Sequence, residues 1–258
     1  MSMNKDRSML TDEQWARLSP LLPGQERSLG TTARDTRQFV EAVLWRARCG
    51  VSWRDLPAER FGPWHTVYAR FRRWRQAGVW PRVLVQVQNA TGLHRLMVDS
   101  TAIRAHQVAA GAKKKDSPVG QALGRSRGGL TTKLHLSCDA YGRICALALT
   151  GGQAGDCLQA PGLLRSHLRA GQAVLADRAY DADYVRVQIE QAGAGAVIPG
   201  KKNRTIPIEH DAEIYKERNQ IERAINGLKR FRAVATRFDK RAANYFATCC
   251  LIAALTWL

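Results

Sequence analysis

Two short apolar segments, each followed at once by an aspartate, constrain the fold of this chain more than any other feature. The segment over residues 96–98 precedes Asp99, and the segment over residues 173–176 precedes Asp177. Apolar runs of this length are typical of strands buried on both faces of an α/β sheet. Because open α/β sheets bind ligands at the ends of such strands, both carboxylates are candidate site residues. Either one taken alone could equally serve only as a helix N-cap.

The remaining pattern predicts a mixed α/β sheet domain over residues 93–258. Alternating apolar residues bounded by turn signals predict strands, and apolar residues at helical spacing predict helices. The expected strands cover residues 94–99, 130–138, 143–149, 173–176 and 194–198, and the expected helices cover residues 156–169, 180–191, a long segment from about Asp211, and 245–258. Three consecutive strands followed by alternating helices and strands indicate antiparallel and parallel parts in one sheet. The last helix is expected to be buried, since it is too short to span a membrane.

Residues 1–92 are expected to form a separate helical domain. A capping box over residues 11–14 begins one helix, and a second helix covers residues 36–49. A short helix over residues 52–56 and a strongly basic helix over residues 64–77 follow, joined by a tight turn. This is the layout of a helix-turn-helix DNA reader, with a solvated arginine face as the alternative. The candidate DNA contacts on the basic helix are Arg70, Arg72, Arg73 and Arg75.

The charge of the chain indicates a polyanionic partner. The chain has 40 Lys and Arg residues against 22 Asp and Glu, a formal net charge of +18 that is spread over its whole length. Because neutralised phosphates release condensed counterions, double-stranded DNA is the expected partner. A membrane is not expected, because the sequence has no basic amphipathic anchor helix, and the polar start without a signal segment predicts a cytoplasmic protein. Further candidate DNA contacts in the long basic segment over residues 104–129 are Lys113, Lys114, Lys115, Arg125 and Arg127.

The long helix that begins near Asp211 carries a charged stripe beside its apolar stripe. At about 100° per residue, the apolar stripe consists of Ile221, Ile225 and Leu228. The neighbouring charged stripe consists of Tyr215, Arg218, Glu222 and Lys229. A solvated face with an ion pair between Arg218 and Glu222 would account for it. A stripe that borders the core is less freely solvated than one opposite it, which favours a functional role.

Asp99, Asp177 and Glu222 together could bind metal ions for phosphodiester chemistry. Their hard oxygen ligands suit Mg²⁺ or Mn²⁺, and two such ions about 4 Å apart can activate a nucleophile and stabilise a leaving oxygen. A zinc site is not expected, because the six cysteines form no CxxC pair. In a chain without a signal segment, such cysteines are expected to be reduced thiols.

The order and spacing of these residues resemble a known family. Tyr215, Arg218, Glu222 and Lys229 form the pattern Tyr-x2-Arg-x3-Glu-x6-Lys, which is similar to the signature of bacterial insertion-sequence transposases of the DDE type. The phrases around both aspartates resemble the insertion sequence five family in particular. So do the segments over residues 10–15, 53–57 and 124–133, and the resemblance covers nearly the whole chain.

The resemblance implies a ribonuclease-H-like catalytic domain in which Asp99, Asp177 and Glu222 are catalytic acids that bind two Mg²⁺ or Mn²⁺ ions. It implies that the helical domain recognises terminal inverted repeats. The implied contacts to the transposon end are Tyr215, Arg218 and Lys229. The implied reaction is hydrolysis at the end of the element, followed by attack of the freed 3′-hydroxyl on target DNA. Because two ends must be held at once, a homodimer or a higher oligomer on DNA is expected.

Two other function classes are compatible with parts of the sequence. A catalytically inactive DNA-binding regulator derived from a transposase would keep the basic helices, but a pure binder gains nothing from acids placed beside phosphates. A stand-alone metal nuclease would use the acids, but it has no evident need for the helical domain. Cleavage and joining of DNA that carries the element's own ends would separate the three classes.

Overall fold

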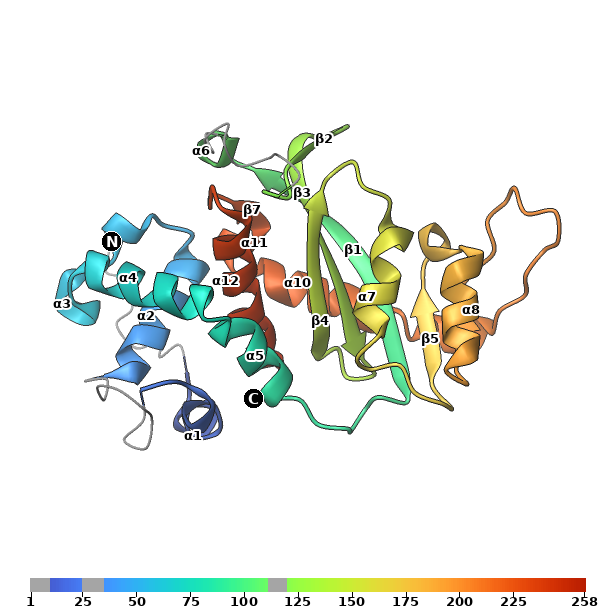
Figure 1. Ribbon diagram of the computed structural model, residues 1–258, viewed down its shortest axis with the longest axis horizontal. Helices are drawn as coiled ribbons and strands as arrows, with labels where there is room; N and C mark the ends of the chain where they lie inside the picture. The colour runs from blue at the N-terminus through green and yellow to red at the C-terminus, as the bar shows by residue number, and fades with distance from the viewer. Residues whose placement is uncertain (1–9, 25–34, 111–119) are drawn as a thin grey trace.

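The computed structural model describes residues 10–24, 35–110 and 120–258. Figure 1 shows two regions side by side, with helices α1 to α5 at one end and the sheet with its covering helices at the other. Helix α12 lies between them. In the described part of the chain, no helix is both long enough and apolar enough to cross a membrane.

Within the described residues, seven strands form one mixed sheet with the order β2-β3-β1-β5-β6. β1 is antiparallel to β3 and parallel to β5, and β5 is parallel to β6. β4 also pairs with β3, and β7 pairs with the far end of β1. The strands are β1 Arg95–Ala105, β2 Gly124–Ser126, β3 Gly129–Asp139, β4 Ile144–Gly151, β5 Ala173–Ala176, β6 Gly195–Val197 and β7 Thr236–Arg237. The mixed α/β sheet predicted from the sequence is confirmed.

The first strand is longer than the sequence predicts. β1 continues past Asp99 to Ala105 because β3 pairs with it as far as Arg104, and the polar residues that follow Asp99 hide this continuation in the hydrophobicity pattern. The basic segment after it, expected as a loop, contains the short helix α6 (Gln107–Ala110) and β2. Lys113, Lys114 and Lys115 lie outside the residues that the structure describes.

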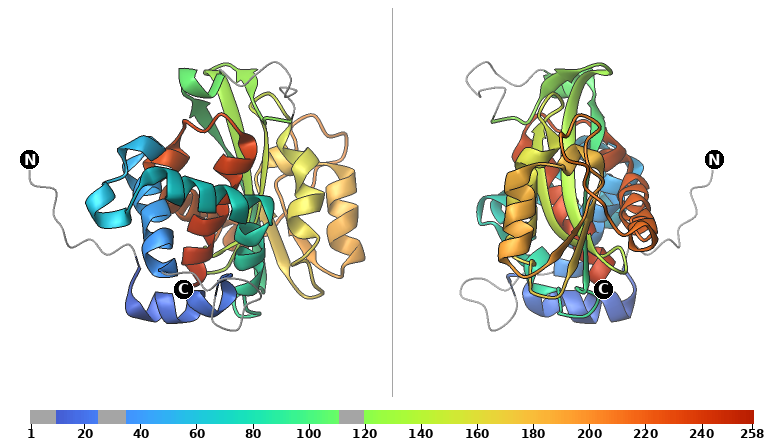
Figure 2. Two further views of the ribbon diagram at one scale, coloured as in Figure 1. Left: turned by 60° about the vertical axis from the view of Figure 1, so that its left-hand side comes forward. Right: turned by 90° about the vertical axis from the view of Figure 1, so that its right-hand side faces the viewer.

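Helices cover both faces of the sheet, as the right-hand view of Figure 2 shows. On one face, α7 (Ala160–Leu164) contacts β1, β3 and β4, and α8 (Asp183–Gln191) contacts β6. On the other face, α10 (Asn219–Lys229) contacts β1 and β3, and α11 (Arg232–Ala235) contacts β1. Because side chains alternate along a strand, Asp99 points to the α10 face and Ser100 points to the α7 face.

The helical region confirms the predicted elements that have local signals. The capping box between Thr11 and Gln14 is present, and α2 ends at Gly50, which adopts the left-handed conformation. The short helix expected over residues 52–56 is present as a 3₁₀ helix, η2 (Trp53–Asp55). Two helices that the pattern did not reveal, α3 and α5, are also present. The helices are α1 Asp12–Leu18, α2 Thr36–Cys49, α3 Ala58–Phe61, α4 Trp64–Gln76 and α5 Val79–Gln86.

The helical region and the sheet share one hydrophobic core. Helix α12 (Ala242–Ala254), expected as a buried terminal helix, contacts α2, α4 and α5 on one side and β4 on the other. In the helical region, the Trp80 ring packs against Phe71 and Trp74, with ring centroids 5.8 and 5.2 Å apart. A buried ion pair between Arg46 of α2 and Asp239, at 3.3 Å, also joins the two regions. The packing is therefore continuous across the domain boundary expected after residue 92.

The long helix expected from Asp211 is in fact two helices, α9 (Ala212–Lys216) and α10. Between them the main chain tightens into 3₁₀ hydrogen bonds, in which Glu217 N–H donates to Ile214 and Arg218 N–H donates to Tyr215. This tighter winding leaves the helical pattern of the sequence almost unchanged. The expected helices over residues 156–169 and 180–191 are likewise replaced by the 3₁₀ turns η3 (Asp156–Gln159) and η4 (Arg178–Tyr180), each followed by a shorter helix, α7 or α8.

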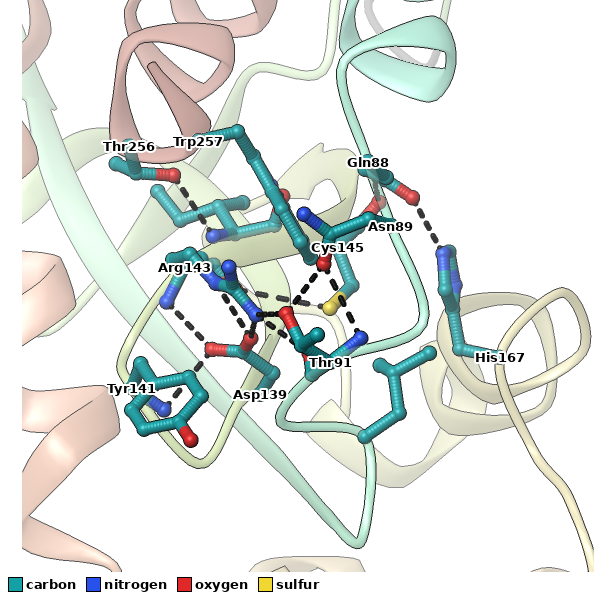
Figure 3. A network of polar contacts seen from close by, with 12 residues as sticks. Gln88, Asn89, Thr91, Asp139, Tyr141, Arg143, Cys145, His167, Thr256 and Trp257 are labelled. Atoms are coloured by element: carbon teal, nitrogen blue, oxygen red, sulfur yellow. Dashed lines mark hydrogen bonds and ion pairs between the residues drawn. The ribbon is translucent and has the colours of Figure 1, made fainter.

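A polar network ties the connection between α5 and β1 to the turn that joins β3 and β4 (Figure 3). Asp139 caps this turn by accepting hydrogen bonds from the main chain of Tyr141 and Arg143, at 3.0 and 2.8 Å. The Arg143 guanidinium donates to Asp139 and to the main chain of Thr91. On the same connection, Gln88 donates to the carbonyl of Cys145 at 2.8 Å. The connection is thus fixed to the sheet by side-chain bonds near its start, at Gln88, and in its middle, at Thr91.

Candidate active site

Asp99 and Asp177 lie next to each other because of the strand register. β1 and β5 are parallel, with Val98 opposite Ala176, so the next residue on each strand is one of the two aspartates. β5 ends at Ala176, and the same edge of β1 is paired again only at Arg104, where β7 begins. Between these points no described strand covers the edge of β1. The two carboxylates stand at one end of this open stretch.

Main-chain hydrogen bonds fix one oxygen of each aspartate. The N–H of Ser100 donates to Asp99 Oδ1 at 2.7 Å, and the N–H of Ala179 donates to Asp177 Oδ1 at 2.9 Å. Asp177 therefore caps the 3₁₀ helix η4, which is the N-cap role that was considered for it from the sequence. The cap uses only Oδ1. Oδ2 of the same carboxylate has no hydrogen bond within the described residues and remains available to a ligand.

Arg218 connects Asp99 to Glu222. Its guanidinium donates to Asp99 Oδ2 at 2.6 Å through Nη2 and to Glu222 Oε1 at 2.7 Å through Nη1. The side chains of Arg218 and Asp99 are 16% and 14% exposed, whereas that of Glu222 is 57% exposed. The ion pair between Arg218 and Glu222, considered from the sequence as a solvated surface pair, is present, but its arginine is buried against Asp99.

The electrostatics of the site follow from this crowding of charge. Burial raises the pKa of Asp99 above its ordinary value, and repulsion by Asp177 and Glu222 adds to this, while attraction to Arg218 and the Ser100 N–H oppose it. Burial alone would lower the pKa of Arg218, but attraction by Asp99 and the neighbouring acids outweighs it and raises that pKa. The guanidinium therefore stays charged and compensates for the carboxylates around it.

The carboxylate oxygens of these acids suit a hard divalent cation. As placed in the structure, however, the three carboxylates do not form a metal site. Among the described residues, no three His, Cys, Asp or Glu side chains are grouped closely enough to hold a metal ion. The Arg218 guanidinium occupies the space between Asp99 and Glu222 in which a shared ion would lie. Metal binding by all three acids therefore requires Arg218 to move away.

A second polar cluster, which the sequence analysis missed, lies on the α7 face behind Asp99. Asp156 accepts a hydrogen bond from Ser100 Oγ at 2.7 Å and pairs with Lys133 Nζ at 2.9 Å. His135 Nδ1 lies 3.8 Å from the same carboxylate, and burial lowers the pKa of His135 to about 4, so the ring is neutral at pH 7. The sequence feature that could have pointed to this cluster is the pair of polar residues Lys133 and His135, which lie on the buried side of an otherwise apolar strand.

The remaining candidate DNA contacts lie in different places. Tyr215, whose ring packs against His210 with centroids 5.2 Å apart, lies on α9. Lys229 is the last residue of α10, the helix that carries Glu222. Arg125 and Arg127 are exposed on the β2–β3 hairpin, away from the carboxylates.

The candidate contacts on α4 also differ among themselves. Arg72 and Arg73 are exposed, and Arg75 is partly buried. Arg70 instead donates to Thr36 Oγ1 at 2.7 Å and lies over the rings of Phe39 and Trp74. Its interactions are thus within the helical region.

Two family models match successive parts of the chain. The model described as "Putative transposase of IS4/5 family" matches residues 10–84, and the model described as "Transposase DDE domain" matches residues 91–257. The second match spans the whole sheet and all of the candidate catalytic acids.

Individual relatives agree with the family models. The chain is 41% identical over 130 residues to a protein of Brucella ovis described as "Putative transposase for insertion sequence element IS6501", covering 50% of this chain and 99% of that protein. It is 42% identical over 105 residues to the uncharacterized protein y4sN of Sinorhizobium fredii, covering 41% of this chain and 83% of that protein. Among solved structures, the piggyBac transposase synaptic complex with hairpin DNA has a similar fold, with a TM-score of 0.53, 12% identity, and coverage of 96% of this chain and 72% of that chain.

Proposed function

The chain belongs to the family of transposases with a DDE domain, and on that premise we propose that it binds the terminal inverted repeats of an insertion element, cleaves the DNA there and joins the freed 3′-hydroxyl to target DNA. The observation that carries this proposal is the parallel register that sets Asp99 beside Asp177, together with Arg218, which links Asp99 to Glu222. Asp99, within β1, therefore lies between Asp177, which follows the end of β5, and Arg218, which also binds Glu222 of α10.

In the proposed reaction, Asp99, Asp177 and Glu222 hold divalent cations, Mg²⁺ or Mn²⁺ and two in number. When bound, such ions would activate the attacking hydroxyl and stabilise the leaving oxygen of the phosphodiester. The Ser100 and Ala179 N–H groups orient the two aspartates before substrate binds, which lowers the cost of arranging them during the reaction. Arg218, released from the acids, would then pair with a DNA phosphate, since a guanidinium binds phosphate and carboxylate in the same geometry.

Asp156 acts in this proposal as a positioning residue for Asp99. It holds Ser100 Oγ from the α7 face, while the main-chain N–H of the same Ser100 holds Asp99 on the α10 face. Lys133 compensates for the charge of Asp156, so the cluster needs no solvent to stabilise it. The orientation of one catalytic acid is thereby controlled from the opposite side of the sheet.

Double-stranded DNA is the proposed partner on the strength of charge. A net charge of +18 and the exposed Arg72 and Arg73 of α4 provide the phosphate contacts that dominate affinity for DNA. Terminal repeats occur in pairs, so the working form is a dimer or a higher oligomer on DNA, acting in the bacterial cytoplasm where the chromosome lies.

A DNA-binding regulator is the second candidate, because Arg218 neutralises two of the acids. One experiment separates the candidates. Supercoiled DNA that carries the element's ends is incubated with the protein in Mg²⁺ or EDTA, and cuts and joints are mapped. The transposase cuts and joins only in Mg²⁺, whereas a regulator binds and leaves the DNA intact.

The variants Asp99→Asn, Asp177→Asn and Glu222→Gln test the residue assignments in the same assay. Each should lose cleavage and keep DNA affinity, because affinity rests on basic side chains. The matched control is Glu213→Gln, which removes an exposed carboxylate that pairs with Lys216 on α9 and with no other residue that the structure describes. A variant that cuts at a rate near that of the wild type would remove its residue from the catalytic set.

A further inference from the structure

A groove with basic side chains along its rim lies on the flank of α10 opposite to the candidate active site, and we name it the junction groove. It has a volume of about 490 Å³ and is formed where the C-terminal end of α2, helix α10 and the end of α12 meet. Leu228 and Ile252 line it with apolar surface, and Arg48, Arg223, Arg230 and Tyr141 contribute its polar and aromatic lining. We propose that the junction groove binds the sugar–phosphate backbone of the DNA whose cleaved end lies at Asp99, Asp177 and Glu222.

The arginines of the junction groove have no anionic partner among the residues that the structure describes. Arg48, Arg223 and Arg230 are exposed, and none forms an ion pair with any described residue. The described residues that line the groove include no Asp or Glu. Arg48 is held over the ring of Phe231, 4.9 Å from its centroid, which positions its charge without neutralising it. Three guanidinium groups that line one groove without an ion-pair partner among the described residues are suited to bind phosphates.

The floor and rim of the groove are accessible to a polymer. Gly227 lines it, and a Cβ built there would have no atom within 4 Å, so a ligand can approach the main chain closely at this point. Tyr141 is 66% exposed and provides an aromatic face at the rim. An amphipathic ring beside guanidinium groups suits deoxyribose and phosphate better than it suits a lipid surface.

The position of the groove relative to the catalytic acids supports a single DNA ligand. Glu222 and Arg223 are consecutive on α10, and about 100° per residue directs them to different flanks of the helix. The two flanks are separated by a helix diameter of about 10 Å. Duplex DNA carries a phosphate for each ~1.7 Å of its axis, so a duplex that reaches the acids has further phosphates within reach of the groove.

The proposed function enters the test of the junction groove in one way: the DNA used is a duplex from the end of the element. A fluorescein-labelled duplex from the end of the element is titrated at increasing salt against the wild type and the double variant Arg223→Gln, Arg230→Gln. We expect the slope of log affinity against log salt to fall by about 0.9 for each lost phosphate contact. Arg165→Gln, which removes an exposed arginine at the end of α7 that has no ion pair within the described residues, should leave the slope unchanged.

Two further measurements decide between a local contact and a general loss of charge or structure. The double variant Arg223→Lys, Arg230→Lys keeps both charges and should keep the wild-type slope. In hydroxyl-radical footprinting, we expect the glutamine variant to leave the DNA beside the cleavage point unprotected. The DNA at the cleavage point should stay protected. An unchanged slope in the glutamine variant, or an equal loss in the Arg165→Gln control, overturns the inference. A wild-type protein that binds without cutting in Mg²⁺ would instead overturn the proposed function.

Discussion

Arg218 contacts two of the three candidate catalytic acids at once, so a cation that binds Asp99 and Glu222 has to displace its guanidinium. We therefore expect Arg218→Ala to bind Mn²⁺ more tightly than the wild type when no DNA is present. The expected gain is about tenfold, equivalent to the lower end of the ~1.5–3 kcal/mol typical of hydrogen bonds to charged groups. Free Mn²⁺ measured by electron paramagnetic resonance reports this affinity without any cleavage reaction.

Two controls make the Arg218 result specific. Arg165→Ala removes a positive charge from the far face of the sheet and should leave Mn²⁺ affinity unchanged. Arg218→Lys keeps the charge but cannot bridge both carboxylates in the same planar geometry, so its affinity should fall between those of the alanine variant and the wild type. Equal or weaker Mn²⁺ binding in Arg218→Ala would mean that the guanidinium does not compete for the metal position.

Asp181 holds the segment after β6 through a buried carboxylate. It accepts hydrogen bonds from Arg186 at 2.8 Å, from Arg204 at 2.7 Å and from the main chain of Lys201 at 2.7 Å. Burial would raise the pKa of Asp181, but Arg204, Lys201 N–H and Arg186 outweigh it and hold that pKa well below its usual range. We expect Asp181→Asn to lower the free energy of unfolding at pH 7 by about 2 kcal/mol.

The pH dependence of this difference has a definite sign. Because the folded pKa of Asp181 lies below the unfolded value of about 3.9, its stabilisation is complete above that pH and is lost as the pH falls further. Urea unfolding at pH 7 and at acid pH should therefore show the wild type and Asp181→Asn converging in acid. A difference that stays constant down to acid pH would assign the effect to packing and not to the charge.

At the scale of single elements, the close approach of α2 and α11 depends on Gly50. Gly50 has φ +71° at the end of α2, and a Cβ there would lie 2.7 Å from Cβ of Arg232. Gly78 has φ +64° but has no atom within 4 Å of such a Cβ. We expect Gly78→Ala to cost about 1 kcal/mol of stability from backbone strain alone, and Gly50→Ala to cost more, because the clash adds to the strain. Thermal unfolding of both variants checks the order, and equal losses would mean that α11 can move aside.

Elements with local signals could be predicted from the sequence, and contacts between distant residues could not. Asp35 and Gly50 mark the two ends of α2 by capping it, and β5 is a short apolar run that ends in Asp177. In contrast, the bond between Arg218 and Asp99 joins residues 119 positions apart. The break between α9 and α10 leaves the spacing of apolar and charged residues in the sequence nearly unchanged. The charged stripe could therefore be predicted, but the 3₁₀ winding between Tyr215 and Glu222 could not.

The candidate acids show the same division. The sequence located Asp99 and Asp177 because each follows an apolar run, and it located Glu222 through its spacing from Arg218. Asp156 was missed as a site residue because the pattern shows it only as the first residue of an expected helix, 56 positions from Ser100. Its contact with Ser100 depends on how η3 packs against the α7 face.

At the scale of the whole molecule, the shared core predicts cooperative unfolding of the helical region and the sheet. Six of the seven tryptophans lie in the first 92 residues, so their fluorescence reports on the helical region, while far-ultraviolet circular dichroism reports on all of the elements. Because α12 packs against both regions and Arg46 pairs with Asp239 across them, we expect the two signals to change at the same denaturant concentration. A fluorescence transition that precedes the circular dichroism transition would show that the helical region unfolds independently.

The position of α12 between the two regions also sets an order of events during protein synthesis. The apolar faces of α2, α4 and α5 leave the ribosome early, but the helix that covers them follows the entire sheet in the sequence. At roughly 5–20 residues per second, these faces wait on the order of ten seconds for their partner. During that interval the nascent chain exposes apolar surface that is prone to aggregation, and a ribosome that stops before Ala242 releases a chain that lacks the helix shared by both regions of the core.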